Sequence, residues 1–101
     1  MGGDGNPGAA GPGEGRAALI QYPTVYAFKV MGRQEHGFRE YVRQLFKRLM
    51  GTEISQDSMS EQPSSRGTYV SVTVEVYLLS EDQRRTIYEA LHRERRIVYY
   101  L

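Results

Sequence analysis

The chain has 101 residues, with 13 lysines and arginines against 12 aspartates and glutamates, and it contains no cysteine. A formal charge of +1 predicts no strong general attraction to nucleic acid or to a membrane surface. The lack of cysteine excludes disulfides, thiol chemistry and cysteine-based zinc sites, and no apolar run approaches the roughly 20 residues of a membrane span. We therefore expect one small cytoplasmic domain.

Residues 1–18 are predicted to be a disordered tail. They hold seven of the eleven glycines and two of the four prolines, and no large apolar residue follows Met1. Such a segment cannot bury enough apolar surface to offset the entropy lost on ordering it. It also lacks the apolar stretch of a signal peptide. The predicted folded domain is therefore residues 19–101.

The first half of this domain predicts a strand followed by a helix. Thr24 to Met31 alternates between two faces, and we expect Gly32 to end the strand. Phe38 to Met50 has apolar residues at spacings of three and four, which predicts an amphipathic helix that ends at Gly51. No clear capping side chain precedes this helix.

The strongest pattern in the chain is the third predicted strand, Thr68 to Leu79. Every second residue is apolar from Val70 to Leu78, so one face of this strand must be buried. The acidic segment Thr52 to Gln62 is placed as a second strand at a sheet edge, where charge discourages pairing with other chains. Residues 63–67 are predicted to form the turn between the two strands.

The last part of the chain predicts a second helix and a short fourth strand. Ser80 and Gln83 form a capping box at the start of the helix, which should run to about Arg93. Ile97 to Leu101 follows as a strand. The whole order predicts an α+β fold: a two-layer ferredoxin-like βαββαβ sandwich, with an antiparallel four-stranded sheet in the order 4-1-3-2 and both helices on one face.

Several short blocks resemble the YbeD family of small bacterial proteins of unassigned function. The resemblance spans about residues 19–101, and Arg66 stands where lysine is more usual. It implies a ferredoxin-like fold similar to the ACT-type regulatory domains of amino-acid enzymes, and it implies no established activity. The blocks are Tyr22-Pro23, Lys29-Val30-Met31-Gly32 and Pro63-Ser64-Ser65-Arg66-Gly67 with Tyr69 and Ser71.

A ligand site is the first functional hypothesis. Gly32 and Gly37 bracket the connection between the first strand and the first helix, where backbone N–H groups can approach an anion near a helix N-terminus. ACT-like domains bind an effector amino acid near this loop. We therefore predict that Gly32, Arg33 and Gly37, with Arg66, line a site for a small metabolite such as an amino acid. The alternative is a connection that needs its glycines only to turn.

An enzyme is the second reading of the same loop. Gly32-Arg33 followed by Gly37-Phe38-Arg39 is similar to the phosphate-holding loop of acylphosphatase, although it is one residue shorter. The catalytic asparagine of that enzyme is missing, since the only asparagine is Asn6 in the tail. Without a group to position the attacking water the mechanism fails, so we expect no enzymatic activity.

Nucleic-acid binding is the third reading, because the RNA-recognition motif shares this order of elements. That motif needs stacking aromatics one and three residues after a basic-glycine pair. After Arg66-Gly67 those positions hold Thr68 and Val70, and the aromatic residue is Tyr69, on the opposite face. Shifting the register would expose the valines to water, so we expect no nucleic-acid partner.

The sheet face that the helices leave open is the second candidate site. Tyrosine tolerates exposure and is enriched at protein interfaces, so this face could bind a protein partner or a second copy. Candidate partner-binding residues are Lys29, Tyr69, Tyr77 and Tyr100, with Ser71, Thr73 and Glu75 beside them.

No cofactor or metal is predicted, because His36 and His92 have no spaced ligand partners. The sequence therefore predicts a non-enzymatic regulatory domain, ACT-like, that binds a small metabolite or controls a metabolic enzyme in trans. The alternative function is a protein–protein adaptor that acts through its open sheet face.

Overall fold

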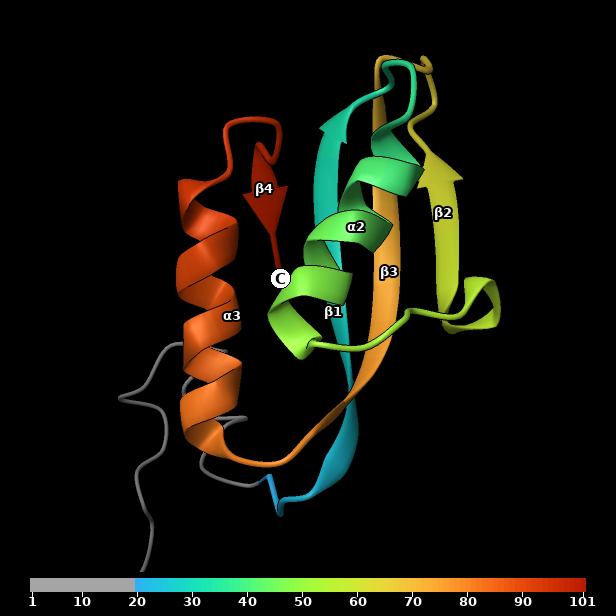
Figure 1. Cartoon of the computed structure of the whole chain (residues 1–101). Helices are drawn as coiled ribbons and strands as arrows, with labels where there is room; N and C mark the ends of the chain where they lie inside the picture. The colour runs from blue at the N-terminus through green and yellow to red at the C-terminus, as the bar shows by residue number, and fades with distance from the viewer. Residues whose placement is uncertain (1–19) are drawn as a thin grey trace, which may run out of the picture.

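The computed structural model describes residues 20–101 (Figure 1). The predicted tail, residues 1–18, lies outside the described residues and stays a prediction. The elements along the chain are β1 (Thr24–Arg33), α2 (Phe38–Met50), a short 3₁₀ helix η2 (Gln56–Ser58), β2 (Met59–Pro63), β3 (Tyr69–Leu78), α3 (Glu81–Arg93) and β4 (Tyr99–Tyr100).

The four strands form one antiparallel sheet in the order β2-β3-β1-β4. Read from the other edge this is the predicted order 4-1-3-2, so the ferredoxin-like α+β fold is confirmed. The two ten-residue strands β1 and β3 form the centre, and Lys29 lies opposite Thr73. Figure 1 shows α2 in front of β1 and β3, while β2 and β4 form the two edges.

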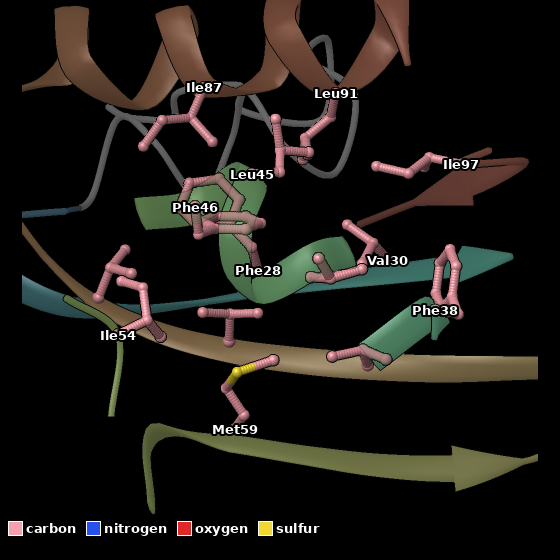
Figure 2. Packing of buried hydrophobic residues seen from close by; sticks show 14 of the residues in the cluster. Phe28, Val30, Phe38, Leu45, Phe46, Ile54, Met59, Ile87, Leu91 and Ile97 are labelled. Carbon is pink, nitrogen blue, oxygen red and sulfur yellow. The ribbon is translucent and has the colours of Figure 1, made fainter. Parts of the chain in front are cut away.

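The core lies between the sheet and the two helices. The apolar positions of β3 are all buried, as the alternation predicted, and Phe28 and Val30 of β1 are fully buried beside them. In Figure 2, Ile87 and Leu91 of α3 point toward Leu45 and Phe46 of α2, above Phe28. The buried side chains of β3 are Val70, Val72, Val74, Val76 and Leu78.

The helix bounds agree with the sequence, and their ends have identifiable causes. Ser80 accepts a hydrogen bond from the backbone N–H of Gln83 at 3.1 Å, which confirms half of the capping box. The Gln83 side chain reaches back to the N–H of Leu79 at 2.8 Å, one residue before the cap. At α2 the N-cap is Gly37, left-handed with φ 80°, and no side chain caps it.

Two predicted boundaries are wrong. Gly32 does not end β1, because the strand continues to Arg33 and Gly32 pairs with Val70 of β3. The second strand begins only at Met59 and includes Pro63, which stands at the edge where a missing N–H costs no ladder bond. Ser55 causes the late start, since its side chain accepts from the N–H of Asp57 at 3.0 Å and holds a 3₁₀ turn.

The predicted fourth strand shortens to two residues, and the expected position of Tyr100 on the open face is wrong. Tyr100 lies opposite Val30 and therefore on the helix-covered side, where it contacts Tyr88 and His92 of α3. Its neighbour Tyr99 takes the open face instead. Because side chains alternate along a strand, an error of one residue in register transfers a side chain to the other face.

Among residues 20–101 no helix is long and apolar enough to cross a membrane. The same part of the chain holds no cluster of three histidines, cysteines or carboxylates that could bind a metal ion.

Candidate functional site

Arg33 is the last residue of β1 and lies at one end of the sheet. Its guanidinium is 5.9 Å from the centre of the Tyr69 ring, which stands directly opposite on β3. The same side chain lies 3.7 Å from the Glu35 carboxylate, and both groups are more than half exposed. An exposed pair of this kind contributes little to stability, so Arg33 is free to exchange Glu35 for another anion.

The other predicted ligand residues lie at the same end of the sheet. The N–H of Gln34 donates to the carbonyl of Thr68 at 2.7 Å, which ties the loop after β1 to the turn before β3. Gly37 lies in that loop and Arg66 in that turn, and both are exposed. The fold therefore gathers Arg33, Gly37 and the Arg66 turn at one end of the sheet.

Gly32 has a packing role in this region. A Cβ atom built on it would lie 2.6 Å from the carbonyl oxygen of Arg96 and closer still to the ring of Phe38. Phe38 is the first residue of α2 and is buried, so its ring packs directly on the Gly32 backbone. A glycine at this position lets the helix start and the loop after α3 approach the strand.

A hollow of about 310 Å³ lies at the N-terminus of α2. Gly37 is the only one of the four predicted ligand residues among its lining residues, which include the carboxylates of Glu35, Glu40 and Glu61. The one cation in the lining, Arg39, already contacts Glu61 at 3.3 Å. These charges oppose an anionic ligand such as an amino-acid carboxylate.

The open face of the sheet presents a different chemistry. Val25 and Tyr77 lie directly opposite each other on β1 and β3, and their exposed fractions are 62% and 56%. Lys29 and Glu75 share this face, and neither belongs to an ion pair within residues 20–101. Ser71 on the same face is buried, and it lies between Met31 of β1 and Gln62 of β2.

Sequence reasoning missed a hydrogen-bonded network that links β1 to α3. Arg84 is 6% exposed and makes two bonds to Glu81, at 3.0 and 3.1 Å. A third bond runs at 3.3 Å to the hydroxyl of Tyr26, which lies 2.9 Å from that of Tyr88. Arg84 also lies 5.2 Å from the centre of the Tyr88 ring.

Hydrogen bonds and burial shift the pKa of Glu81 and of Tyr22, which bonds to it. The hydrogen bonds from Arg84 are the main cause that holds the pKa of Glu81 below its ordinary value. The hydroxyl of Tyr22, which donates to Glu81 at 2.7 Å, is the second cause. Burial, and then the bond to the Glu81 carboxylate, raise the pKa of Tyr22 to about 12. Glu81 and Tyr22 thus keep their usual charge states at neutral pH, and the hydrogen bonds of Arg84 are made within the network, which fits a structural link.

A signal for this network is present in the sequence. Arg84 stands one turn before Ile87 and Tyr88 on the inward stripe of α3, where an apolar residue would be usual. A charged residue on a buried stripe requires a partner of opposite charge within reach, and Glu81 at three residues' distance is the nearest carboxylate on the same side.

The strand order and the two helices on one face define a small α+β domain of the ferredoxin-like class. The chain belongs to a family described as a protein of unknown function (DUF493), whose model matches residues 17–101. This agrees with the resemblance to the YbeD family of small bacterial proteins.

Two relatives illustrate the family. The chain is similar to a UPF0250 protein of Ralstonia nicotianae, with 37% identity over 76 residues that cover 75% of this chain and 77% of the relative. A UPF0250 protein of Leptothrix cholodnii is 34% identical over 74 residues, which cover 73% of this chain and 80% of the relative.

A solved structure supports the fold. The solution structure of protein HP0495 from H. pylori superposes with a TM-score of 0.61 at 15% identity, covering 81% of this chain and 85% of that one. At this identity the likeness concerns the fold alone.

Proposed function

We propose that this domain is a non-enzymatic adaptor of the bacterial cytoplasm that docks onto another protein through the open face of its sheet. The observation that carries the proposal is the exposed pair Val25 and Tyr77 on a face that neither helix covers. Exposed aromatic and apolar side chains gathered on one face favour a protein interface.

The partner surface that fits this face is apolar and carries acidic groups. It offers an apolar patch for Val25 and Tyr77, and carboxylates for the unpaired Lys29 and for Arg33 at the end of the same strand. Arg33 can leave Glu35 at little cost, because that ion pair is exposed. Regulation of a metabolic enzyme in trans is one activity that such docking would serve.

Photo-cross-linking in native cells tests this proposal. A photoreactive residue replaces Tyr77, and a control chain carries it at Arg48, which is exposed on α2. We expect one discrete adduct from position 77 that disappears when Lys29 is changed to glutamate, and none from position 48. Equal adducts from both positions would refute docking through the open face.

A metabolite site at the start of α2 is the second candidate. The observation that favours it is the left-handed Gly37, which leaves the N-terminus of α2 without a side-chain cap beside the hollow of about 310 Å³. In this proposal Gly32, Arg33, Gly37 and Arg66 remain the ligand residues. The hollow's carboxylates can bind the ammonium group of an amino acid, while its carboxylate meets the arginines or the start of α2.

An amide ¹H–¹⁵N NMR titration with pooled amino acids and small amines tests the second candidate. Saturable shifts at Gly37 that are lost in Arg33→Ala and retained in Tyr77→Ala would support it. Unmoved peaks at millimolar ligand would reject it and leave the adaptor.

A further inference from the structure

The two edges of the sheet differ in how they are protected. β2 carries Glu61 and ends in Pro63, and its last four residues are exposed and polar or proline. Charge and proline are the usual devices that prevent another strand from pairing with an edge. The β4 edge has neither device, because residues 97–101 contain no charged side chain and no proline.

Three of the large apolar side chains that are more than half exposed lie on or beside β4. Val98, Tyr99 and Leu101 have exposed fractions of 54%, 57% and 56%. A short segment with this much exposed apolar surface, at an unprotected edge, is typical of a contact with another strand.

The backbone of β4 has hydrogen-bonding groups available at this edge. Both the N–H and the C=O of Leu101 bond to Lys29 of β1, at 2.8 and 3.1 Å. Since these groups alternate in direction along a strand, those of Tyr100 point away from β1, toward the open edge.

We propose that two copies of this chain join along β4, antiparallel about a two-fold axis at Tyr100, to form a continuous eight-stranded sheet. In this arrangement Tyr100 exchanges both backbone bonds with Tyr100 of the second copy. Tyr99 then lies opposite Leu101 of the second copy, and Leu101 opposite Tyr99, because an isologous contact is reciprocal. The exposed side chains thus cover each other.

The charges on α3 complement themselves about the same axis. Tyr88 and His92, one turn apart, both contact Tyr100, so an axis at Tyr100 passes close to the middle of that turn. Two antiparallel α3 helices then bring Glu89 beside Arg93 of the second copy. Both residues are exposed, and neither belongs to an ion pair within the described part of the chain.

A hollow between α3 and β4 lies at the same edge of the sheet. Glu89, His92, Arg93 and the two tyrosines Tyr88 and Tyr100 line this hollow of about 300 Å³. In the proposed dimer the hollows of the two copies face each other across the axis, so that the Glu89 carboxylate of one copy lies opposite the Arg93 guanidinium of the other. The strand contact is short, so the interface belongs to the small class, below about 1,200 Å² in total, and the dimer is concentration-dependent.

Sedimentation velocity of the whole chain, from about 10 to 500 μM, tests the proposal over the range expected for a small interface. The mass should rise from one chain to two. Glu89→Arg and Arg93→Glu should each raise the dissociation constant of the dimer about tenfold, since each places two like-charge contacts across the axis. The double variant E89R/R93E should recover wild-type affinity to within about threefold, because it restores both ion pairs.

Asp82→Arg is the control, since it makes the same charge change on an exposed position at the other end of α3 and should leave the dimer intact. Circular dichroism shows that each variant is folded. A wild-type chain that stays a single chain throughout would overturn the proposal. The proposal would also be overturned if neither single variant weakened the dimer, or if the double variant did not regain wild-type affinity.

Discussion

At Gly32 the fold brings the Phe38 ring and the Arg96 carbonyl closer to the strand than any side chain would permit. The same glycine in the sequence invites a ligand-binding interpretation, because glycines in a strand-to-helix loop are typical of anion sites. Packing alone is a sufficient reason for its presence here. At the scale of single residues, the chemistry of a position therefore depends on which groups the fold brings beside it.

Gly32→Ala should lower the free energy of unfolding by about 1–3 kcal/mol, since the backbone carbonyl of Arg96 cannot move away as a side-chain end would. Urea unfolding followed by circular dichroism measures the change. The control is Gly67→Asn: Gly67 has φ 73° and open space around its α-carbon, and asparagine tolerates this conformation. Equal stability of Gly32→Ala and wild type would refute the packing role.

The ion pair of Glu81 with Arg84 should make the stability of the fold depend on pH. The pKa of Glu81 lies below the ordinary value of 4.5 in the folded chain, so the stabilising effect of its carboxylate is complete above that value and is lost as the pH falls through the lowered pKa. Glu81→Gln should cost about 2 kcal/mol at pH 7, because buried Arg84 loses its charged partner.

The stability difference between Glu81→Gln and wild type should shrink as the pH falls from about 5 toward 2, as chemical denaturation across this range would show. Glu75→Gln, exposed on the open face, is the matched control and should change stability little at any pH. A deficit that stays constant down to the lowest pH would contradict the role of the Glu81 charge.

At the scale of elements, the two helices begin in different ways. α3 starts at Ser80, whose side chain accepts the N–H of Gln83, whereas α2 starts at Gly37 with no side-chain cap. α2 is held by packing instead, since Phe38, Val42, Leu45 and Phe46 are buried. The lack of a side-chain cap at its start is what makes that end a ligand candidate.

Ser80→Ala should therefore lower the free energy of unfolding by about 1 kcal/mol, which is the usual cost of losing an N-cap. Ser55→Ala serves as the control, because Ser55 caps only a three-residue 3₁₀ turn at an exposed position. Its cost should be clearly smaller in the same urea titration. If both variants lose the same amount, the cap of α3 contributes nothing specific.

At the scale of the whole molecule, the fold could be predicted because long-range order follows from strong local patterns. The valines of β3 require a covered face, and the stripes of α2 and α3 supply the cover. The sequence places the second strand at an edge because of its acidic residues, and β2 does form an edge, although Glu61 is the only acidic residue within it. These features depend on periodicity, which a sequence displays directly.

The candidate sites were less predictable because they depend on register and on contacts between distant segments. The placement of Tyr100 failed by one residue in a strand of two, where little pattern exists to set the register. The Arg84 network joins residues 58 positions apart, and the packing of Phe38 on Gly32 depends on how α2 meets β1. Spacing along the chain indicates the Arg84–Glu81 pair, but it gives neither the contact with Tyr26 nor the packing on Gly32.

The adaptor proposal makes the open sheet face the working surface of the molecule. A protein cross-linked to position 77 supplies the partner for a direct measurement of affinity by isothermal titration calorimetry. The control variant is Arg48→Ala, which removes an exposed side chain on α2, on the other side of the sheet.

We predict that Tyr77→Ala weakens binding of this partner at least about tenfold, as truncation of an interfacial tyrosine anchor usually does, and that Arg48→Ala changes it less than about twofold. Equal affinity of wild type and Tyr77→Ala would contradict docking through the open face.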